Sequence, residues 1–107
     1  MKNAKIFLVE DEEAVVVFLR RMFSRRGHEV VLEAKSLDGA LDIIKSGMLE
    51  QKGVNLAIVD GRFPEAKGKK KVSGGLIVAK AIRGSDPSIR VIAFSGEAPE
   101  SLTYGDA

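Results

Sequence analysis

The stretch IFLVEDEE, residues 6–13, and the stretch LAIVD, residues 56–60, decide the fold of this chain. Each begins with four apolar residues and then turns acidic, at Glu10 and Asp11 in the first stretch and at Asp60 in the second. Continuous apolar runs are typical of parallel strands that are buried on both faces, and the carboxyl ends of such strands meet at one edge of a sheet. We therefore expect the three carboxylates to lie together. Because they repel one another, a cation is expected among them.

Outward from these stretches, the chain alternates between strand and helix patterns. Strands are predicted at residues 5–9, 28–34, 54–59 and 90–94, and helices at residues 12–26, after an N-cap at Ser36, and at residues 74–83. Gly27 suits the position just past the end of the first helix. The alternation indicates an α/β fold with a parallel sheet and right-handed crossovers.

Apolar residues at helical spacing predict a buried face for each helix. In the first helix, the residues at this spacing are Val15, Phe18, Leu19, Met22 and Phe23. The buried face of the second helix is predicted to hold Leu37, Leu41, Ile44 and Met48, and the third helix is predicted to have Leu76, Ile77, Ala79 and Ile82 partly buried. Residues 61–73 are predicted to form a loop, which carries the basic tract KGKKK at residues 67–71.

Composition limits the classes of protein to which the chain can belong. Its 107 residues are expected to form a single domain, residues 1–107. A net charge of +2 is too small to indicate binding to nucleic acid or to a membrane surface. The absence of cysteine excludes disulfides and thiolate metal sites, and no apolar stretch approaches the roughly 20 residues that span a bilayer. We expect a cytoplasmic protein.

The carboxylates also have a possible chemistry. Mg²⁺ prefers oxygen ligands, and three carboxylates at two strand ends can supply them. Asp60 stands alone at the end of its strand, so it could attack a phosphoryl group and form an acyl phosphate. Ser95, which follows the strand at residues 90–94, could donate a hydrogen bond to a phosphoryl oxygen.

Four motifs follow one another in the order of a known family. They are LVEDE at residues 8–12, NLAIVD at residues 55–60 with Pro64 behind it, SGGL at residues 73–76, and VIAFSG at residues 91–96. Together they resemble the receiver domain of two-component response regulators over nearly the whole chain. The resemblance implies a flavodoxin-like doubly wound parallel sheet with the strand order 2-1-3-4-5.

The resemblance also implies roles for named residues. Asp60 would accept phosphate from a histidine kinase or a phosphotransfer protein, and Ser95 would be the switch hydroxyl. The Mg²⁺ ligands would be Glu10, Asp11, Asp60 and the backbone carbonyl of Arg62. Such a protein is a signalling phosphoacceptor rather than an enzyme, although it would promote its own phosphorylation and dephosphorylation.

The chain departs from the family pattern in two places. It stops at Ala107, about where the family's fifth strand would begin, so strand 5, helix 5 and the phosphate-binding lysine of the family are expected to be missing. We then expect the fourth strand to be an exposed edge through which the protein self-associates. The loop at residues 61–73 is longer than usual. Its basic tract is either a solvated loop or a cation source for the phosphate or for an acidic partner.

Two other functions remain open. A pseudo-receiver would keep the fold as a protein-binding module without phosphotransfer, and the absent lysine favours it, whereas the intact acidic trio favours the phosphoacceptor. A haloacid-dehalogenase-type phosphohydrolase also uses an aspartate after an apolar strand. That class needs a second aspartate two residues on, where this chain has Arg62.

Overall fold

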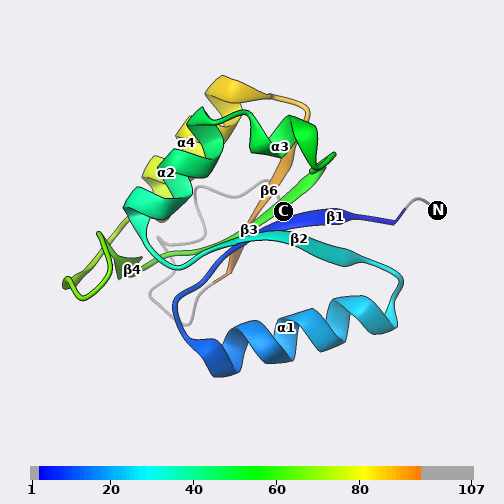
Figure 1. Cartoon of the computed structure of the whole chain (residues 1–107), viewed down its shortest axis with the longest axis horizontal. Coiled ribbons are helices and arrows are strands. Elements are labelled where there is room, and N and C mark those ends of the chain that lie inside the picture. The colour runs from blue at the N-terminus through cyan, green and yellow to red at the C-terminus, as the bar shows by residue number, and fades with distance from the viewer. Residues whose placement is uncertain (1–2, 95–107) are drawn as a thin grey trace.

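A four-stranded parallel sheet forms the centre of the protein (Figure 1). The computed structural model describes residues 3–94. The sheet contains β1 (Lys5–Val9), β2 (Glu29–Ala34), β3 (Leu56–Asp60) and β6 (Arg90–Phe94), in the order β2-β1-β3-β6. All three strand pairs are parallel. The predicted α/β class and the first four positions of the predicted strand order are therefore confirmed. The prediction about a fifth strand concerns residues outside the described part of the chain.

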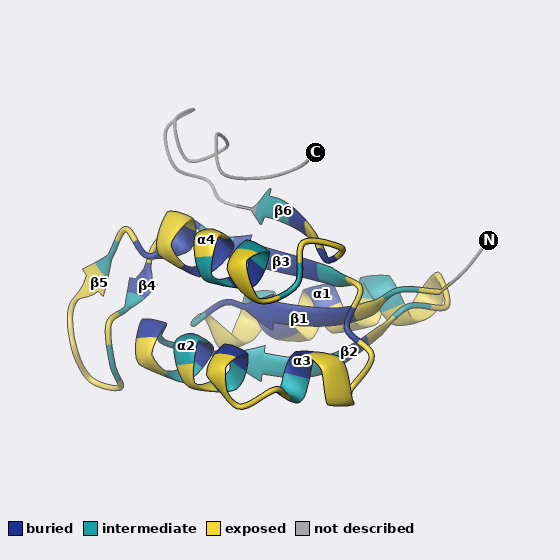
Figure 2. Cartoon of the chain, turned by 90° about the horizontal axis from the view of Figure 1, so that it is seen from above, coloured by how far each residue is buried: buried dark blue, intermediate teal, exposed yellow. Residues whose placement is uncertain are grey.

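Helices cover both faces of this sheet. Helix α1 (Glu13–Arg25) lies on one face, and α2 (Leu37–Lys45), α3 (Met48–Gln51) and α4 (Gly75–Ser85) lie on the other, as the two views in Figures 1 and 2 show. Within residues 3–94, no helix has the length and the apolar composition needed to cross a lipid bilayer.

Strand β1 explains why residues 6–9 are apolar at every position. Ile6 and Leu8 pack in the core on the α1 side, whereas Phe7 and Val9 pack in the core beneath α2 and α4. All four side chains are completely buried. Successive residues of a strand point to opposite faces, so a strand with a core on each face needs an apolar residue at each position.

Local signals set the ends of the first two helices as predicted. The hydroxyl oxygen of Ser36 accepts a hydrogen bond from the backbone N–H of Gly39 at 3.0 Å, which caps α2. Gly27, just beyond α1, has a φ of +81°, in the left-handed region that favours glycine. Met48 lies outside the second helix, contrary to the prediction, because α2 ends at Lys45 and Met48 begins α3.

The buried faces of α1 and α4 were predicted only in part. Phe18 keeps the helical spacing of the predicted apolar positions of α1, but it is 64% exposed, and Val16 is buried. Leu76 and Ile77 are likewise exposed, whereas Val78 is buried. Both helices contain a run of at least four consecutive apolar residues, so no polar residue marks which side of the run faces solvent.

The segment at residues 61–73, predicted to be a loop, contains a short β-hairpin. Strand β4 (Phe63–Pro64) pairs antiparallel with β5 (Lys71–Val72). Phe63 is completely buried, and Val72 packs against the same core. The only signal in the sequence was one apolar residue on each side of the basic tract, Phe63 before it and Val72 after it. Two single apolar residues do not distinguish a hairpin from a loop.

Candidate functional site

The strand register brings the three acidic residues to one edge of the sheet. Val9 of β1 lies opposite Val59 of β3, so Glu10 and Asp60, the next residues, lie at the same level. One carboxylate oxygen from each of Glu10, Asp11 and Asp60 can be chosen so that these atoms lie within 4.8 Å of one another. The structure therefore places together the three carboxylates that the sequence pattern singled out, and they could hold a metal ion.

Burial disfavours the charged form of two of these carboxylates. Glu10 is only 3% exposed, and burial raises its pKa to about 7, with the charges of Asp60 and Asp11 acting in the same direction. Burial also raises the pKa of Asp60, against the hydrogen bonds that its carboxylate accepts from the backbone N–H groups of Gly61 and Arg62. The site thus holds a proton readily near neutral pH, unless another cation takes its place.

Asp11 has an oxygen that lacks a partner. Its Oδ1 is buried and, among residues 3–94, accepts no hydrogen bond. A buried carboxylate oxygen without a partner is costly, and a bound cation removes that cost. Three clustered carboxylates, one of which has an oxygen that no described residue contacts by a hydrogen bond, fit a hard cation such as Mg²⁺, which takes oxygen ligands.

A lysine from the hairpin reaches the same edge. The Nζ of Lys71 lies 3.5 Å from Oδ2 of Asp11 and 3.5 Å from Oε1 of Glu12. Charge-assisted hydrogen bonds are usually about 2.7–2.9 Å long, so Lys71 is held loosely. The negative charge of Asp11 is the main reason why the pKa of Lys71 is raised. Sequence reasoning noted the basic tract but could not select this lysine, because the selection depends on the hairpin pairing.

The remaining predicted residues have different outcomes. Ser95 lies outside the described residues. The guanidinium of Arg62 donates a hydrogen bond to the backbone carbonyl oxygen of Lys71 at 3.4 Å, and metal binding by the carbonyl of Arg62 stays a prediction. Glu13 pairs with Lys35, away from the acidic cluster, as expected for a charge at the start of a helix.

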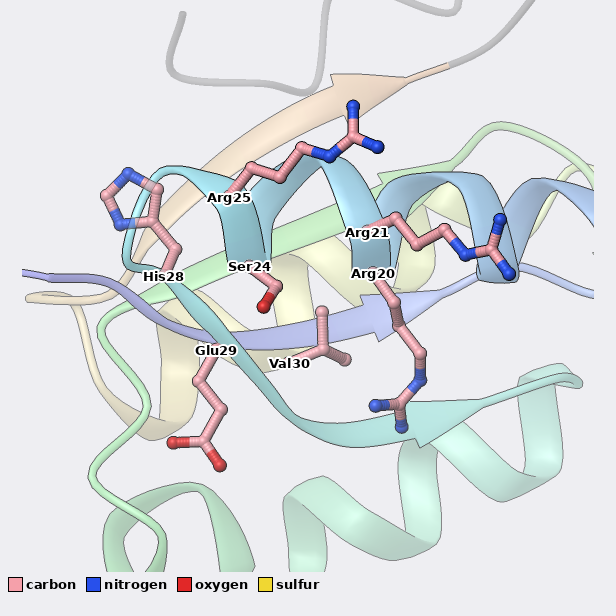
Figure 3. Close-up of a pocket in the computed structure, with 7 residues that line it drawn as sticks. All are labelled: Arg20, Arg21, Ser24, Arg25, His28, Glu29 and Val30. Atoms are coloured by element: carbon pink, nitrogen blue, oxygen red, sulfur yellow. The ribbon is translucent and has the colours of Figure 1, made fainter.

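A cavity lies at the end of β2 that is away from the acidic cluster. This cavity of about 430 Å³ is lined by Arg20, Arg21, Ser24, Arg25, His28, Glu29 and Val30 (Figure 3). The three arginine side chains point in different directions in Figure 3, and Arg20 pairs with Glu33. The Nδ1 of His28 accepts a hydrogen bond from the backbone N–H of Ala4 at 2.8 Å, which is a structural contact. No convergent set of donors marks this cavity as a binding site.

Comparison with known proteins identifies one family. The sequence pattern of the response regulator receiver domain matches residues 6–104. The transcriptional regulatory protein YvrH of Bacillus subtilis (strain 168) is 32% identical over 50 residues. That alignment covers 47% of this chain but only 21% of YvrH, so it spans about a fifth of the relative's length.

Solved structures share the fold. A response regulator receiver protein from Sinorhizobium medicae WSM419 gives a TM-score of 0.75 at 22% identity, over 99% of this chain and 77% of that one. A LuxR-family two-component response regulator from Aurantimonas sp. SI85-9A1 gives 0.72 at 25% identity, over 95% and 65%. The response regulator PhyR from Brucella abortus gives 0.72 at 24% identity, over 96% and 37%.

Proposed function

Because the chain belongs to the response regulator receiver domain family, we propose that it accepts a phosphoryl group on Asp60 in a two-component phosphorelay. Receiver domains are signalling domains rather than classical enzymes. The observation that supports this proposal best is the acidic cluster of Glu10, Asp11 and Asp60, in which one buried oxygen of Asp11 has no partner within the described part of the chain.

The surroundings of Asp60 suit a nucleophile. The backbone N–H of Gly61 donates a hydrogen bond to Oδ1 of Asp60 at 2.7 Å, which orients the carboxylate. A carboxylate oxygen of Asp60 would attack the phosphorus of the donor and form a P–O bond. The bond from phosphorus to the leaving group breaks, and the leaving group takes the electron pair. The proposed donor is a histidine kinase or a phosphotransfer protein.

The acidic cluster would also hold Mg²⁺. Glu10, Asp11 and Asp60 would supply carboxylate oxygens, and the backbone carbonyl of Arg62 would complete the protein ligands. When bound, the ion supplies positive charge that offsets the negative charge of the transferred group. The same proposal includes Ser95 as the switch hydroxyl. It also includes a cytoplasmic location for the protein.

A protein-binding module without phosphotransfer is the second candidate. The observation in its favour is the contact between Lys71 and Asp11, which balances part of the carboxylate charge without a metal ion. In that case the acidic cluster would serve the stability of the fold or the binding of a partner, and Asp60 would not be modified.

One experiment separates the two candidates. The protein is incubated with acetyl phosphate and Mg²⁺, and its intact mass is measured. We expect the mass to increase by one phosphoryl group in the wild type and in the matched control Asp42→Asn, an exposed aspartate on α2. The Asp60→Asn variant is expected to show no increase. A wild type that forms no adduct with either acetyl phosphate or beryllofluoride would reject the phosphoacceptor and favour the binding module.

A further inference from the structure

The β4–β5 hairpin is fixed to the body of the protein at its base. Phe63 is completely buried, and a Cβ atom built on Gly74 would lie only 2.8 Å from Cε1 of its ring. On the other side, the backbone carbonyl of Glu65 accepts a hydrogen bond from the backbone N–H of Asp38, in the first turn of α2, at 2.9 Å. The hairpin is thus anchored to the starts of α2 and α4, which border the acidic edge.

The strand pairing directs Lys71 toward this edge. Phe63 lies opposite Val72, and Pro64 lies opposite Lys71. Successive side chains of a strand point to opposite faces. Since the side chain of Val72 packs against the core, the side chain of its neighbour Lys71 points away from the core. The ammonium of Lys71 accordingly lies 3.5 Å from both Asp11 and Glu12.

We propose that Lys71 is a phosphoryl-binding residue, whose ammonium moves from Asp11 to the phosphoryl oxygens once Asp60 carries the group. This inference rests on the proposed phosphoacceptor function. It assigns to the hairpin a part in binding at the acidic site, and it predicts tetrahedral oxyanions as the ligand class. No covalent bond to Lys71 forms or breaks in this step.

Two physical reasons favour the move. A phosphoryl group brings about 1.5 to 2 negative charges to Asp60, beside the present contact of Lys71. A cation on Asp11 would at the same time weaken the attraction that now holds the ammonium. The long, flexible stem of lysine allows a shift of a few ångströms without rearrangement of the hairpin, and the side chain is half-exposed, so its motion is not blocked by packing.

The test is the affinity for beryllofluoride, a phosphoryl analogue, at saturating Mg²⁺. Loss of a charge-assisted contact in Lys71→Ala is expected to weaken beryllofluoride binding about tenfold. The Lys71→Arg variant, which keeps the charge, is expected to stay within about threefold of the wild type. Lys70→Ala is the matched control, since Lys70 is the exposed neighbour in the tract, and it should bind as the wild type does.

Mg²⁺ affinity without beryllofluoride serves as the second readout. If Lys71 acts on the phosphoryl group, Lys71→Ala should bind Mg²⁺ at least as tightly as the wild type, because a competing positive charge is gone. Equal beryllofluoride affinity in Lys71→Ala and wild type would overturn this inference and leave the phosphoacceptor function standing. A parallel loss of Mg²⁺ affinity would overturn it too, as a purely structural effect. A wild type that binds no beryllofluoride would reject both.

Discussion

Glu10 is the one charged side chain that is buried within residues 3–94. Its Oε2 accepts a hydrogen bond from the backbone N–H of Glu12 at 2.9 Å, which favours the ionised form, but burial prevails and raises its pKa to about 7. The ordinary pKa of a glutamate is 4.5, so at a pH between 4.5 and about 7 Glu10 holds a proton in the folded protein that it has released in the unfolded chain. The acidic cluster therefore couples folding to proton binding.

This coupling predicts how stability depends on pH. Between about pH 4.5 and pH 7, the folded state binds more protons at Glu10 than the unfolded state does, so the free energy of unfolding should fall as the pH rises. The expected fall is on the order of a few kcal/mol. It can be measured by urea denaturation at a series of pH values in the presence of a chelator.

Two controls accompany the pH measurement. Glu10→Gln removes the titrating group but keeps an oxygen that can accept the hydrogen bond from Glu12, so its stability should depend less on pH. Saturating Mg²⁺ should also reduce the fall, because a cation in the cluster favours the ionised carboxylates. A wild-type stability that rises with pH over this range in the presence of the chelator would contradict the prediction.

At the scale of single residues, the sequence located the acidic cluster but not its basic neighbour. Glu10, Asp11 and Asp60 were predictable because each follows an apolar strand, and parallel strands present their carboxyl ends at one edge. Lys71 was not predictable, since its position depends on which residue it faces across a hairpin with strands of two residues. Such short pairings leave no periodic pattern in a sequence.

At the scale of elements, the packing of the hairpin on α4 explains a glycine. A methyl group at Gly74 would lie 2.8 Å from Cε1 and 2.9 Å from Cζ of Phe63, whose side chain is completely buried. We expect Gly74→Ala to lower the free energy of unfolding by about 1–3 kcal/mol, because the added carbon overpacks this contact. Urea denaturation measures the change.

Gly84, near the end of α4, provides a glycine control for Gly74, the residue just before that helix. A Cβ atom on Gly84 would meet nothing within 4 Å. Since alanine favours helix more than glycine does, Gly84→Ala should leave stability unchanged or raise it by up to about 1 kcal/mol. Equal effects of the two substitutions would mean that the contact with Phe63 does not limit the residue at position 74.

The helices themselves show where pattern reasoning loses information. The ends of α1 and α2 were predictable from Gly27 and Ser36, which act locally on the backbone. The rotation of α1 about its axis was not, because residues 15–19 are all apolar and the helix can be turned without bringing a polar residue into the core. Packing against Ile6 and Leu8 sets the rotation of α1, because it buries Val16 and leaves Phe18 exposed.

At the scale of the whole molecule, the alternation of strand and helix predicted the α/β class and the parallel sheet, whereas the strand order was predicted from the resemblance to the receiver family. Right-handed crossovers and short connections leave few ways to arrange four parallel strands with helices on both faces. The order β2-β1-β3-β6 is one of these, and it sets β1 and β3 side by side at the centre. The same arrangement that buries the two apolar stretches therefore brings their acidic ends together.

The outer edge of β6 carries the last prediction. Among residues 3–94, no strand lies beside this edge in the sheet, and an edge strand can pair with the strand of a second chain. We expect the protein to self-associate through β6, with an average mass in light scattering after size-exclusion chromatography that rises with concentration.

Ile92→Lys should shift the protein toward monomer, because lysine on an edge strand opposes pairing. Ile92 is only half-buried, so the ammonium of the new side chain can reach solvent. Ile92→Val keeps the strand preference and should associate as the wild type does. A wild type that stays monomeric at the highest concentration reached would rule out this edge as an interface.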